Sequence, residues 1–174
     1  MSARFASAGA LTLYGGYRVG ALLGFVGLVQ NPRTEYREAI VGIGRTFGFG
    51  ARNSVLAGLA VADASDARYT QVHLLPLVVA GPLLLDGTLE GYLPLGARGA
   101  AQLSASPLNL LYRPGARHAI GLSYVNGIQR GQTPAHAVGP SLRLGIPHGT
   151  LALDVLHSVG LQRRDLRLTA QVAY

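Results

Sequence analysis

A histidine and two carboxylates near the middle of the chain have the residue types that general-base catalysis uses. His73 precedes the dipeptide Gly81-Pro82, and Asp86 and Glu90 follow it. A two-residue turn at that dipeptide would place His73 opposite Glu90 across a hairpin, with Asp86 on the same face. A carboxylate in that position can orient an imidazole for proton transfer. Because no serine is placed as an obvious nucleophile, the sequence favours a buried polar pair, with a lipid-modifying or proteolytic enzyme as the alternative.

A second pair of opposite charges lies nearer the C-terminus. A two-residue turn at His148-Gly149 would place Arg143 directly opposite Asp154. If the hairpins of this chain close into a narrow β-barrel, such a pair has two interpretations. It is a structural ion pair, or it is a charged constriction that selects permeating ions. The sequence predicts that seven charged or titratable residues face this lumen: Arg18, His73, Asp86, Glu90, Arg143, Asp154 and Arg167.

The elements that must position these residues are indicated by apolar side chains at every second position, which is the period of a β-strand. The C-terminal segment shows the alternation best. One face carries Leu166, Leu168, Ala170, Val172 and Tyr174, and the other carries Asp165, Arg167, Thr169, Gln171 and Ala173. Similar two-faced segments span residues 83–95, 120–129, 138–146 and 151–161, and a phase change near Pro107 predicts a β-bulge within 102–112. One face of such a sheet can contact lipid while the other contacts water.

The composition excludes several classes of protein. The 174 residues are 49% hydrophobic and 13% charged, with a mean hydropathy of +0.29. A disordered chain is charge-rich and apolar-poor, and an ordinary soluble domain carries about 25% charged residues. No apolar run reaches the ~18 residues that a membrane-spanning helix needs. The 15 basic residues are all arginine and are scattered along the chain, which argues against nucleic-acid binding.

The connections between the predicted strands alternate between tight turns and longer polar loops. Tight turns are predicted at Ala51-Arg52-Asn53, Gly81-Pro82, Pro114-Gly115-Ala116 and His148-Gly149. Short turns on one side and longer loops on the other are typical of outer-membrane barrels. We therefore expect a single all-β domain over residues 1–174, a transmembrane antiparallel up-and-down barrel of about ten strands within a range of eight to twelve. This number treats residues 11–29 as one strand and residues 1–8 as a candidate flexible N-terminal tail.

The C-terminal segment from Leu166 to Tyr174 resembles the assembly signal of bacterial outer-membrane β-barrels, in which hydrophobic residues at alternating positions precede a terminal aromatic residue. The resemblance to this class covers nearly all of the chain and points to no single family within it. It implies an outer-membrane location and the barrel assembly machinery as a partner. The residues of the implied signal are Leu166, Leu168, Ala170, Val172 and Tyr174.

Arginines in the longer loops have two interpretations. They could bind phosphate groups of outer-leaflet lipids, because a guanidinium group binds phosphate bidentately, or they could keep the loops solvated. These residues are Arg33, Arg37, Arg68, Arg98, Arg130, Arg163 and Arg164. No loop has the D-x-D-x-D spacing of calcium ligands, and the chain has no cysteine, so no metal site or cofactor is predicted.

These observations favour an integral outer-membrane β-barrel that acts as a small passive pore or as a structural membrane protein, without catalysis. Positive charge in the lumen and at the rim would favour anions. Glycines on the predicted inner wall either relieve crowding where the wall curves or leave open space. Together with inward aliphatic residues they indicate a narrow or closed barrel. A soluble lipocalin-like barrel that binds an apolar ligand is a further alternative, and it requires the two faces to be exchanged.

Overall fold

The computed structural model describes residues 1–7, 9–115, 117–159 and 164–172. Within these ranges the chain forms twelve β-strands. They are β1 (Ser2–Ala6), β2 (Leu11–Val19), β3 (Leu22–Asn31), β4 (Tyr36–Gly48), β5 (Ser54–Ala64), β6 (Arg68–Ala80), β7 (Leu83–Pro94), β8 (Gln102–Tyr112), β9 (His118–Gln129), β10 (Ala135–Ile146), β11 (Gly149–Ser158) and β12 (Arg164–Val172). The described residues include no helix that is long and apolar enough to span a membrane.

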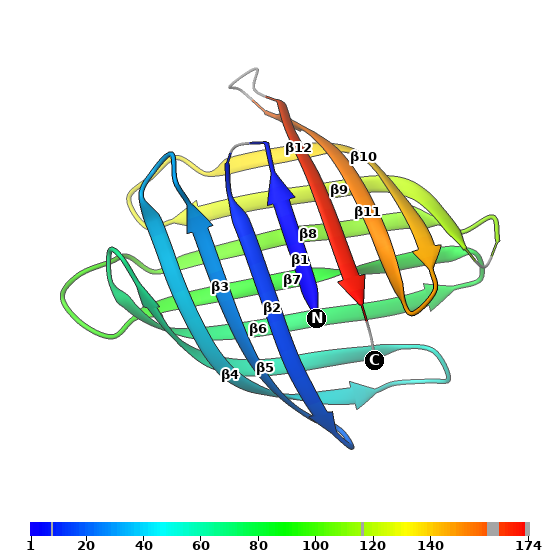
Figure 1. The fold of residues 1–174 in the computed structure, drawn as a ribbon, viewed down its shortest axis with the longest axis horizontal. Helices are drawn as coiled ribbons and strands as arrows, with labels where there is room; N and C mark the ends of the chain where they lie inside the picture. Colours follow the sequence, from blue (N-terminus) through cyan, green and yellow to red (C-terminus); the bar gives the residue numbers. More distant parts are fainter. Residues whose placement is uncertain (8, 116, 160–163, 173–174) are drawn as a thin grey trace.

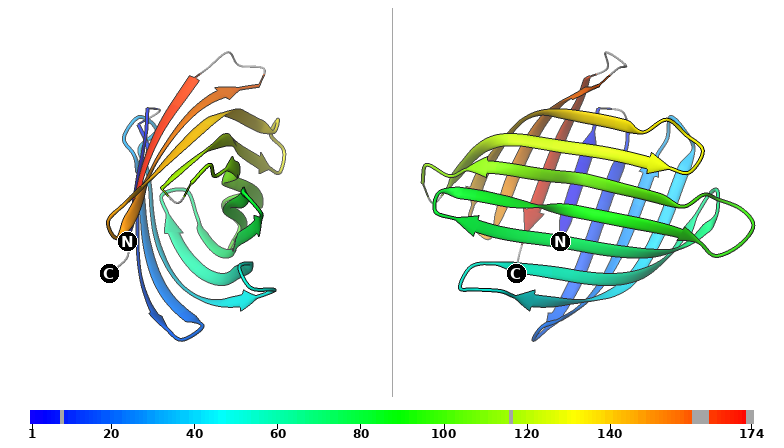
Figure 2. Two further views of the ribbon diagram at one scale, coloured as in Figure 1. Left: turned by 90° about the vertical axis from the view of Figure 1, so that its right-hand side faces the viewer. Right: turned by 180° about the vertical axis from the view of Figure 1, so that it is seen from behind.

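The strands form one closed barrel in which neighbours in sequence pair antiparallel. β1 closes the barrel because it pairs with β2 on one side and with β12 on the other, so that Phe5 lies between Leu11 and Leu168. Figure 1 shows β1, β2, β3, β11 and β12 in the wall nearest the viewer, and Figure 2 shows β5 to β9 in the wall behind them. Closure gives each of the described strands a hydrogen-bonded neighbour on both sides and so leaves no free sheet edge among them.

Twelve strands correct the expected number of about ten, and the first difference lies in residues 11–29. This segment forms two strands, β2 and β3, which are separated by a turn at Gly20-Ala21. Gly20 has a φ of 59°, which suits a tight turn because glycine has no Cβ. The expectation of one strand was wrong because residues 22–29 are apolar on both faces, so no polar residue marks the change of phase.

The second difference is the N-terminal segment, where the sequence suggested a flexible tail. Residues 2–6 form β1 and pair with residues 167–171 of β12, while residues 2–5 pair with β2. The amino group of Met1 also donates a 2.8 Å hydrogen bond to the carbonyl oxygen of Val172. A strand of five residues is too short to show a convincing alternation in the sequence.

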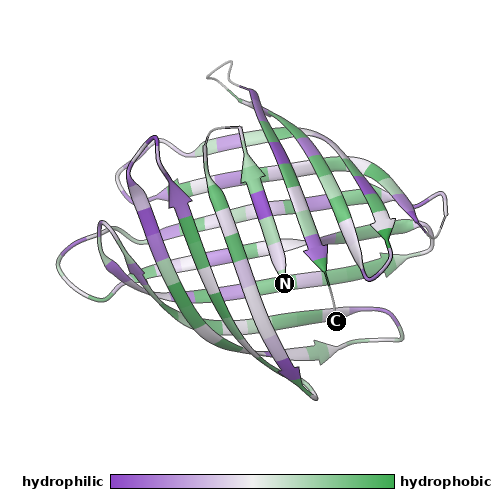
Figure 3. Cartoon of the chain, in the orientation of Figure 1, coloured by the Kyte–Doolittle hydropathy of each residue, from purple (hydrophilic) through white to green (hydrophobic). Residues whose placement is uncertain are grey.

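The two faces of the barrel wall have opposite polarity, as the alternation predicts. On β11, Leu153 and Val155 face outward and are 38% and 40% exposed, whereas Asp154 between them is 2% exposed. Figure 3 shows the same change from hydrophobic to hydrophilic residues along many of the strands. A soluble lipocalin-like barrel needs the apolar face inside, so this structure corrects that alternative.

The two ends of the barrel differ in the length of their connections. The end that carries Met1, here the terminal end, has turns at residues 20–21, 49–53, 81–82, 113–117 and 147–148. The opposite loop end has connections at residues 7–10, 32–35, 65–67, 95–101, 130–134 and 159–163. Three turns of the terminal end have only two residues, and no connection of the loop end has fewer than three. The terminal-end turns at residues 49–53 and 113–117 have five residues, however, and are longer than the loop-end connections at 7–10, 32–35 and 65–67. The predicted asymmetry of short turns and longer loops is therefore only partly present.

The register of the hairpins agrees with the sequence at one turn and is shifted by two residues at the others. The β6–β7 hairpin pairs His73 with Glu90, as predicted. The β10–β11 hairpin pairs Arg143 with Ala152 and not with Asp154. The predicted three-residue turns at 51–53 and 114–116 would pair Phe49 with Val55 and Leu110 with Ile120. The structure instead pairs Phe47 with Val55 and Leu110 with Leu122. A shift of two residues keeps every side chain on its face, so the faces were predicted correctly although the partners were not.

The predicted β-bulge near Pro107 lies in β8. Ala105 and Leu108 pair with both neighbouring strands, whereas Ser106 and Pro107 between them pair with neither. The distortion extends into β7, where Gly87 has a φ of 149° and an added Cβ would overlap the carbonyl oxygen of Pro107. The bulge frees the carbonyl oxygen of Ser106 from the sheet ladder, so it can accept a hydrogen bond from inside the barrel.

Candidate permeation pathway

The interior of the barrel contains two adjoining spaces, with volumes of about 910 and 520 Å³. The larger space, called the passage below, is lined by Asp66 and Gln129 toward the loop end and by Met1 and Val172 at the terminal end. It therefore extends along the barrel. The smaller space, called the side chamber, has no described residue of a loop-end connection in its lining. Both spaces are lined by Arg4, Arg18, Leu56, Leu75, Thr88, Thr150 and Gln171.

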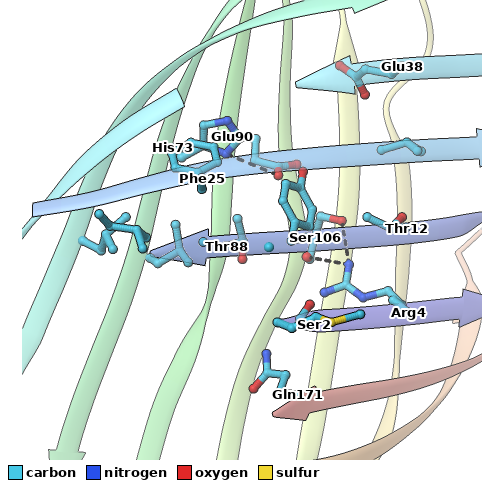
Figure 4. Close-up of a pocket in the computed structure, with 18 of the residues that line it drawn as sticks. Ser2, Arg4, Thr12, Phe25, Glu38, His73, Thr88, Glu90, Ser106 and Gln171 are labelled. Atoms are coloured by element: carbon cyan, nitrogen blue, oxygen red, sulfur yellow. Dashed lines mark hydrogen bonds and ion pairs between the residues drawn. The ribbon is translucent and has the colours of Figure 1, made fainter. Parts of the chain in front are cut away.

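Arg4 crosses the interior at the boundary between the two spaces. Its Nη1 donates to the carbonyl oxygen of Ser106 at 2.9 Å and to the Ser106 hydroxyl at 3.3 Å. Its Nε donates to the hydroxyl of Thr169 at 3.3 Å. β1 and β8 lie in opposite walls, and Figure 4 shows the Arg4 side chain directed at Ser106. A single guanidinium group thus bridges the lumen, and the carbonyl that receives it is the one freed by the β8 bulge.

Polar side chains of β4, β6 and β7 form a hydrogen-bonded chain along the passage. Gln71 donates to Glu38 Oε1 at 2.5 Å, and Gln71 Oε1 lies 2.9 Å from His73 Nε2. His73 Nδ1 in turn lies 3.6 Å from Glu90 Oε1, and the Phe25 and His73 rings lie nearly perpendicular with centroids 5.4 Å apart (Figure 4). The sequence therefore placed His73 and Glu90 together correctly.

Of the two carboxylates of the predicted catalytic alternative, Glu90 lies beside His73 but Asp86 does not. Asp86 pairs with Leu77 in the β6–β7 ladder and forms its ion pair elsewhere. The hydroxyl of Ser104 donates to Glu90 Oε2 at 3.3 Å and not to the imidazole. Because the two imidazole nitrogens face Gln71 and Glu90, His73 belongs to a buried polar network, and among the described residues no hydroxyl is hydrogen-bonded to its ring.

Asp86 binds Arg143, which corrects the predicted pair of Arg143 with Asp154. Arg143 donates from Nη1 to Asp86 Oδ2 and from Nη2 to Asp86 Oδ1, the second at 2.9 Å. Asn109 donates to the same Oδ1 at 2.9 Å. β8 and β9 separate β7 from β10 in the sheet, so these side chains meet across the concave inner surface. The expected partner was wrong because the hairpin is shifted and because the long arginine side chain reaches a strand that is not its neighbour.

The remaining predicted lumen residues have different environments. Arg167 is the ladder neighbour of Asp154, yet its Nε donates to Asp165 Oδ2 at 2.8 Å. Asp154 lines the side chamber, and its Oδ1 has no hydrogen-bond partner among the described residues. Arg18 lies near the end of β2 and lines both spaces. Six of the seven predicted residues thus line a space, Arg167 being the exception, and their role in a constriction stays a prediction.

The charges that line the two spaces are mostly negative. The described lining includes five carboxylates, three guanidinium groups and the amino group of Met1, with histidine taken as neutral. The carboxylates are Glu38, Asp66, Asp86, Glu90 and Asp154, and the guanidinium groups are Arg4, Arg18 and Arg143. The whole chain, in contrast, has a net charge of +7. The expectation of a positive lumen does not hold for this lining.

Aromatic and acidic side chains share the loop-end part of the passage. We call this part the vestibule and define it by Tyr36, Glu38, Asp66, Tyr69, Glu90 and Tyr92. The hydroxyl of Tyr69 donates to Asp66 Oδ2 at 2.8 Å, and the hydroxyl of Tyr92 donates to Glu90 Oε2 at 3.2 Å. The rings of Tyr69 and Tyr92 meet edge to face with centroids 5.9 Å apart.

The predicted loop arginines and the C-terminal segment are placed as follows. Arg33, Arg37, Arg68, Arg98, Arg130 and Arg164 are exposed at the loop end, and Arg163 lies outside the described residues. Arg68 donates to Asp63 at 2.8 Å on the exposed surface. On β12, Leu166 and Leu168 face outward, Ala170 is half-buried, and Val172 lines the passage at the terminal end. Tyr174 lies outside the described residues.

Comparison with known proteins identifies the fold. No protein-family model and no curated protein sequence matches the chain. The KdgM porin matches with a TM-score of 0.69 at 12% identity, over 99% of this chain and 96% of its own. The NanC porin matches with a TM-score of 0.70 at 8% identity, over 99% and 98%. A porin refined at 1.8 Å matches with a TM-score of 0.54 at 14% identity, over 95% and 62%. The chain therefore has the fold of a closed porin-type β-barrel.

Arg4 is an interior residue that the sequence did not single out, and the vestibule residues Tyr36, Glu38, Tyr69 and Tyr92 were also missed. The Arg4 neighbours Ser2 and Ala6 face inward with it, while Phe5 is 55% exposed on the outside. A period-two pattern is therefore present in residues 2–6, but its apolar face contains only Ala3 and Phe5. The number of strands could have revealed this strand. Dividing residues 11–29 into two strands raises the expected ten strands to eleven, and a barrel with an even number of strands then requires one more.

Proposed function

We propose that this protein is a passive pore in the bacterial outer membrane. The observation that carries the proposal is the passage, whose lining runs from Asp66 toward the loop end to Met1 at the terminal end of a closed barrel. The outer surface is apolar, as the exposures of Val41 at 62% and Ile43 at 71% illustrate. A barrel with an apolar exterior and a polar interior satisfies its backbone groups in lipid and offers solutes a hydrated route. The porin-type fold supports the same function.

The proposal includes an orientation and a single barrel domain over residues 1–174. Outer-membrane barrels carry short turns in the periplasm and longer loops outside the cell. The terminal end therefore faces the periplasm, and the loop end with its exposed arginines faces the outer leaflet. Arg33, Arg37 and Arg130 at that end are suited to lipid phosphates because guanidinium groups bind phosphate bidentately.

The proposal also includes assembly by the barrel assembly machinery through the C-terminal strand. Leu166 and Leu168 are 49% and 51% exposed on the outer face of β12, next to the closing strand. Hydrophobic residues at alternating positions before Tyr174 form the pattern that resembles the assembly signal of this class.

Electrical recording tests the pore. The full chain is folded into detergent, checked for a different electrophoretic mobility before and after boiling, and added to a planar lipid bilayer. Folded protein should produce stepwise increases in current, and boiled protein at the same concentration should produce none. If protein that passes the mobility check inserts into vesicles but gives no current steps, the barrel is closed and the proposed function is wrong.

A further inference from the structure

We infer that the pore takes organic cations, which bind in the vestibule before they pass Arg4. This inference rests on the proposed pore and adds the class of solute that the pore selects. Three features of the lining carry it: the excess of carboxylates, the neutral character of the groups that bind the vestibule carboxylates, and the aromatic rings around them.

The carboxylates outnumber the cationic groups in both spaces together, five to four, and the fourth cationic group is the amino group of Met1 at the terminal end. Two of these carboxylates are in the side chamber, where Asp86 is neutralised by Arg143 and Asp154 lines the wall. The other three lie in the vestibule, at the end from which an external solute enters. A lining of one sign raises the local concentration of ions of the opposite sign, because low-dielectric walls focus the field.

The vestibule carboxylates are held by neutral donors, so their negative charges are not cancelled locally. Glu38 accepts from the amide of Gln71, and Asp66 accepts from the hydroxyl of Tyr69. Glu90 accepts from Tyr92 and Ser104, with His73 at 3.6 Å. Among the described residues no arginine forms an ion pair with any of the three. Neutral hydrogen bonds position a carboxylate while leaving its charge available to a ligand.

Tyrosine rings line the passage beside these carboxylates and favour organic over inorganic cations. Tyr36, Tyr69 and Tyr92 belong to the vestibule, and Tyr14 lies deeper in the same passage. The face of an aromatic ring attracts an ammonium or guanidinium group, most strongly where the cation is poorly hydrated. The passage volume of about 910 Å³ lies within the range of sites for small organic molecules.

The same lining disfavours acidic solutes. A structural neighbour, the KdgM porin, has been solved in complex with disordered oligogalacturonate, a polymer of acidic sugars. Such a chain would meet Asp66, Glu38 and Glu90 before it reached a cationic group of this passage, and like charges at close range oppose binding.

Reversal potentials in a gradient of potassium chloride test the sign of the selectivity. The wild-type pore should pass K⁺ in preference to Cl⁻. Asp66→Asn and Glu90→Gln should each shift the reversal potential toward the Cl⁻ value. Asp63→Asn is the matched control, because Asp63 lies near the same end but on the exposed surface beside Arg68, and it should leave the potential unchanged. If Glu90→Gln does not fold, Asp66→Asn in the loop carries the comparison.

Block by tetraethylammonium tests the aromatic contribution. The ion should reduce the K⁺ current when added to the loop side, and Tyr36→Leu should weaken the block about two- to fivefold, the range of one cation–π contact. Tyr17→Leu is the control, because Tyr17 is 79% exposed on the outside of β2. A wild-type pore that prefers Cl⁻, or a block that Tyr36→Leu and Tyr17→Leu alter equally, overturns the inference and leaves the pore standing. Absence of current from folded protein overturns the proposed pore itself.

Discussion

Arg4 joins two walls of the barrel through hydrogen bonds to Ser106 and Thr169. Its acceptors are neutral, so the guanidinium charge is not cancelled by a direct ion pair within the described residues. The side chain lines both the passage and the side chamber. It therefore limits the cross-section and contributes a positive charge at the same point of the route.

Replacement of Arg4 by alanine should increase single-channel conductance, because truncation removes the side chain that separates the two spaces. It should also raise the preference for K⁺ over Cl⁻, because one of the three guanidinium groups of the lining is lost. Arg52→Ala is the control, since Arg52 lies in an exposed terminal-end turn and is absent from both linings. Conductance equal to that of the wild type would show that Arg4 does not limit the pathway.

Single residues were predictable from the sequence where local chain geometry fixes them. His73 and Glu90 were placed together correctly because a two-residue turn sets the register of their hairpin. Arg143 was assigned the wrong partner because its bond to Asp86 crosses two intervening strands, and sequence spacing within one hairpin carries no information about such contacts. Arg4 was missed because its strand has five residues.

At the scale of strands, inward glycines have two different surroundings. An added Cβ at Gly121 would overlap the carbonyl oxygen of Leu110, and one at Gly139 would overlap that of Val155. An added Cβ at Gly127, in contrast, would have no atom within 4 Å. Both sequence interpretations of inward glycine therefore occur: close approach of neighbouring strands at Gly121 and Gly139, and open space at Gly127.

Gly139→Ala should destabilise the barrel by roughly 1–3 kcal/mol, the usual cost of forcing an extra carbon into a packed site. Gly127→Ala on the adjacent strand β9 should change the free energy of unfolding by no more than about 0.5 kcal/mol. Urea unfolding in lipid vesicles, followed by tryptic protection or electrophoretic mobility, measures both variants. Equal effects of the two substitutions would contradict the assignment of close strand approach at Gly139.

The strands themselves were predictable wherever one face is apolar and the other polar. β12 and β11 show this pattern, and their faces agree with the sequence. The prediction failed for residues 22–29 because Leu23, Phe25 and Val29 are apolar yet line the passage. The alternation that normally marks a strand and its turn is therefore absent from this segment. Where apolar side chains face inward, the sequence no longer shows where one strand ends and the next begins.

On the scale of the whole molecule, the sign of the charge changes with location. The chain carries +7 in total, and its exposed loop-end arginines contribute much of that charge. The lining of the interior carries more carboxylates than arginines. Composition alone therefore predicted the wrong sign for the lumen, because it cannot separate residues at the rim from residues along the route.

Removal of residues 1–6 should prevent the barrel from closing, because β2 and β12 would each lose their partner on one side. Unpaired strand edges are unfavourable in lipid, where no water replaces the lost hydrogen bonds. The shortened chain should lose the difference in electrophoretic mobility between unboiled and boiled samples. Phe5→Ala, which keeps the β1 backbone, is the control and should retain the difference. A shortened chain that still shows it would contradict the role of β1 in closure.

Among the described residues, β1 has five residue pairs with β12 and four with β2, whereas the other neighbouring strands have eight or more. The junction with the fewest backbone bonds is therefore the one that holds Arg4, and thermal opening of β1 would withdraw the guanidinium group from the passage. In electrical recordings of the wild-type pore, the link between opening of β1 and withdrawal of the Arg4 side chain should appear as current noise. Brief excursions to a higher current level should become more frequent on warming and should be absent from Arg4→Ala.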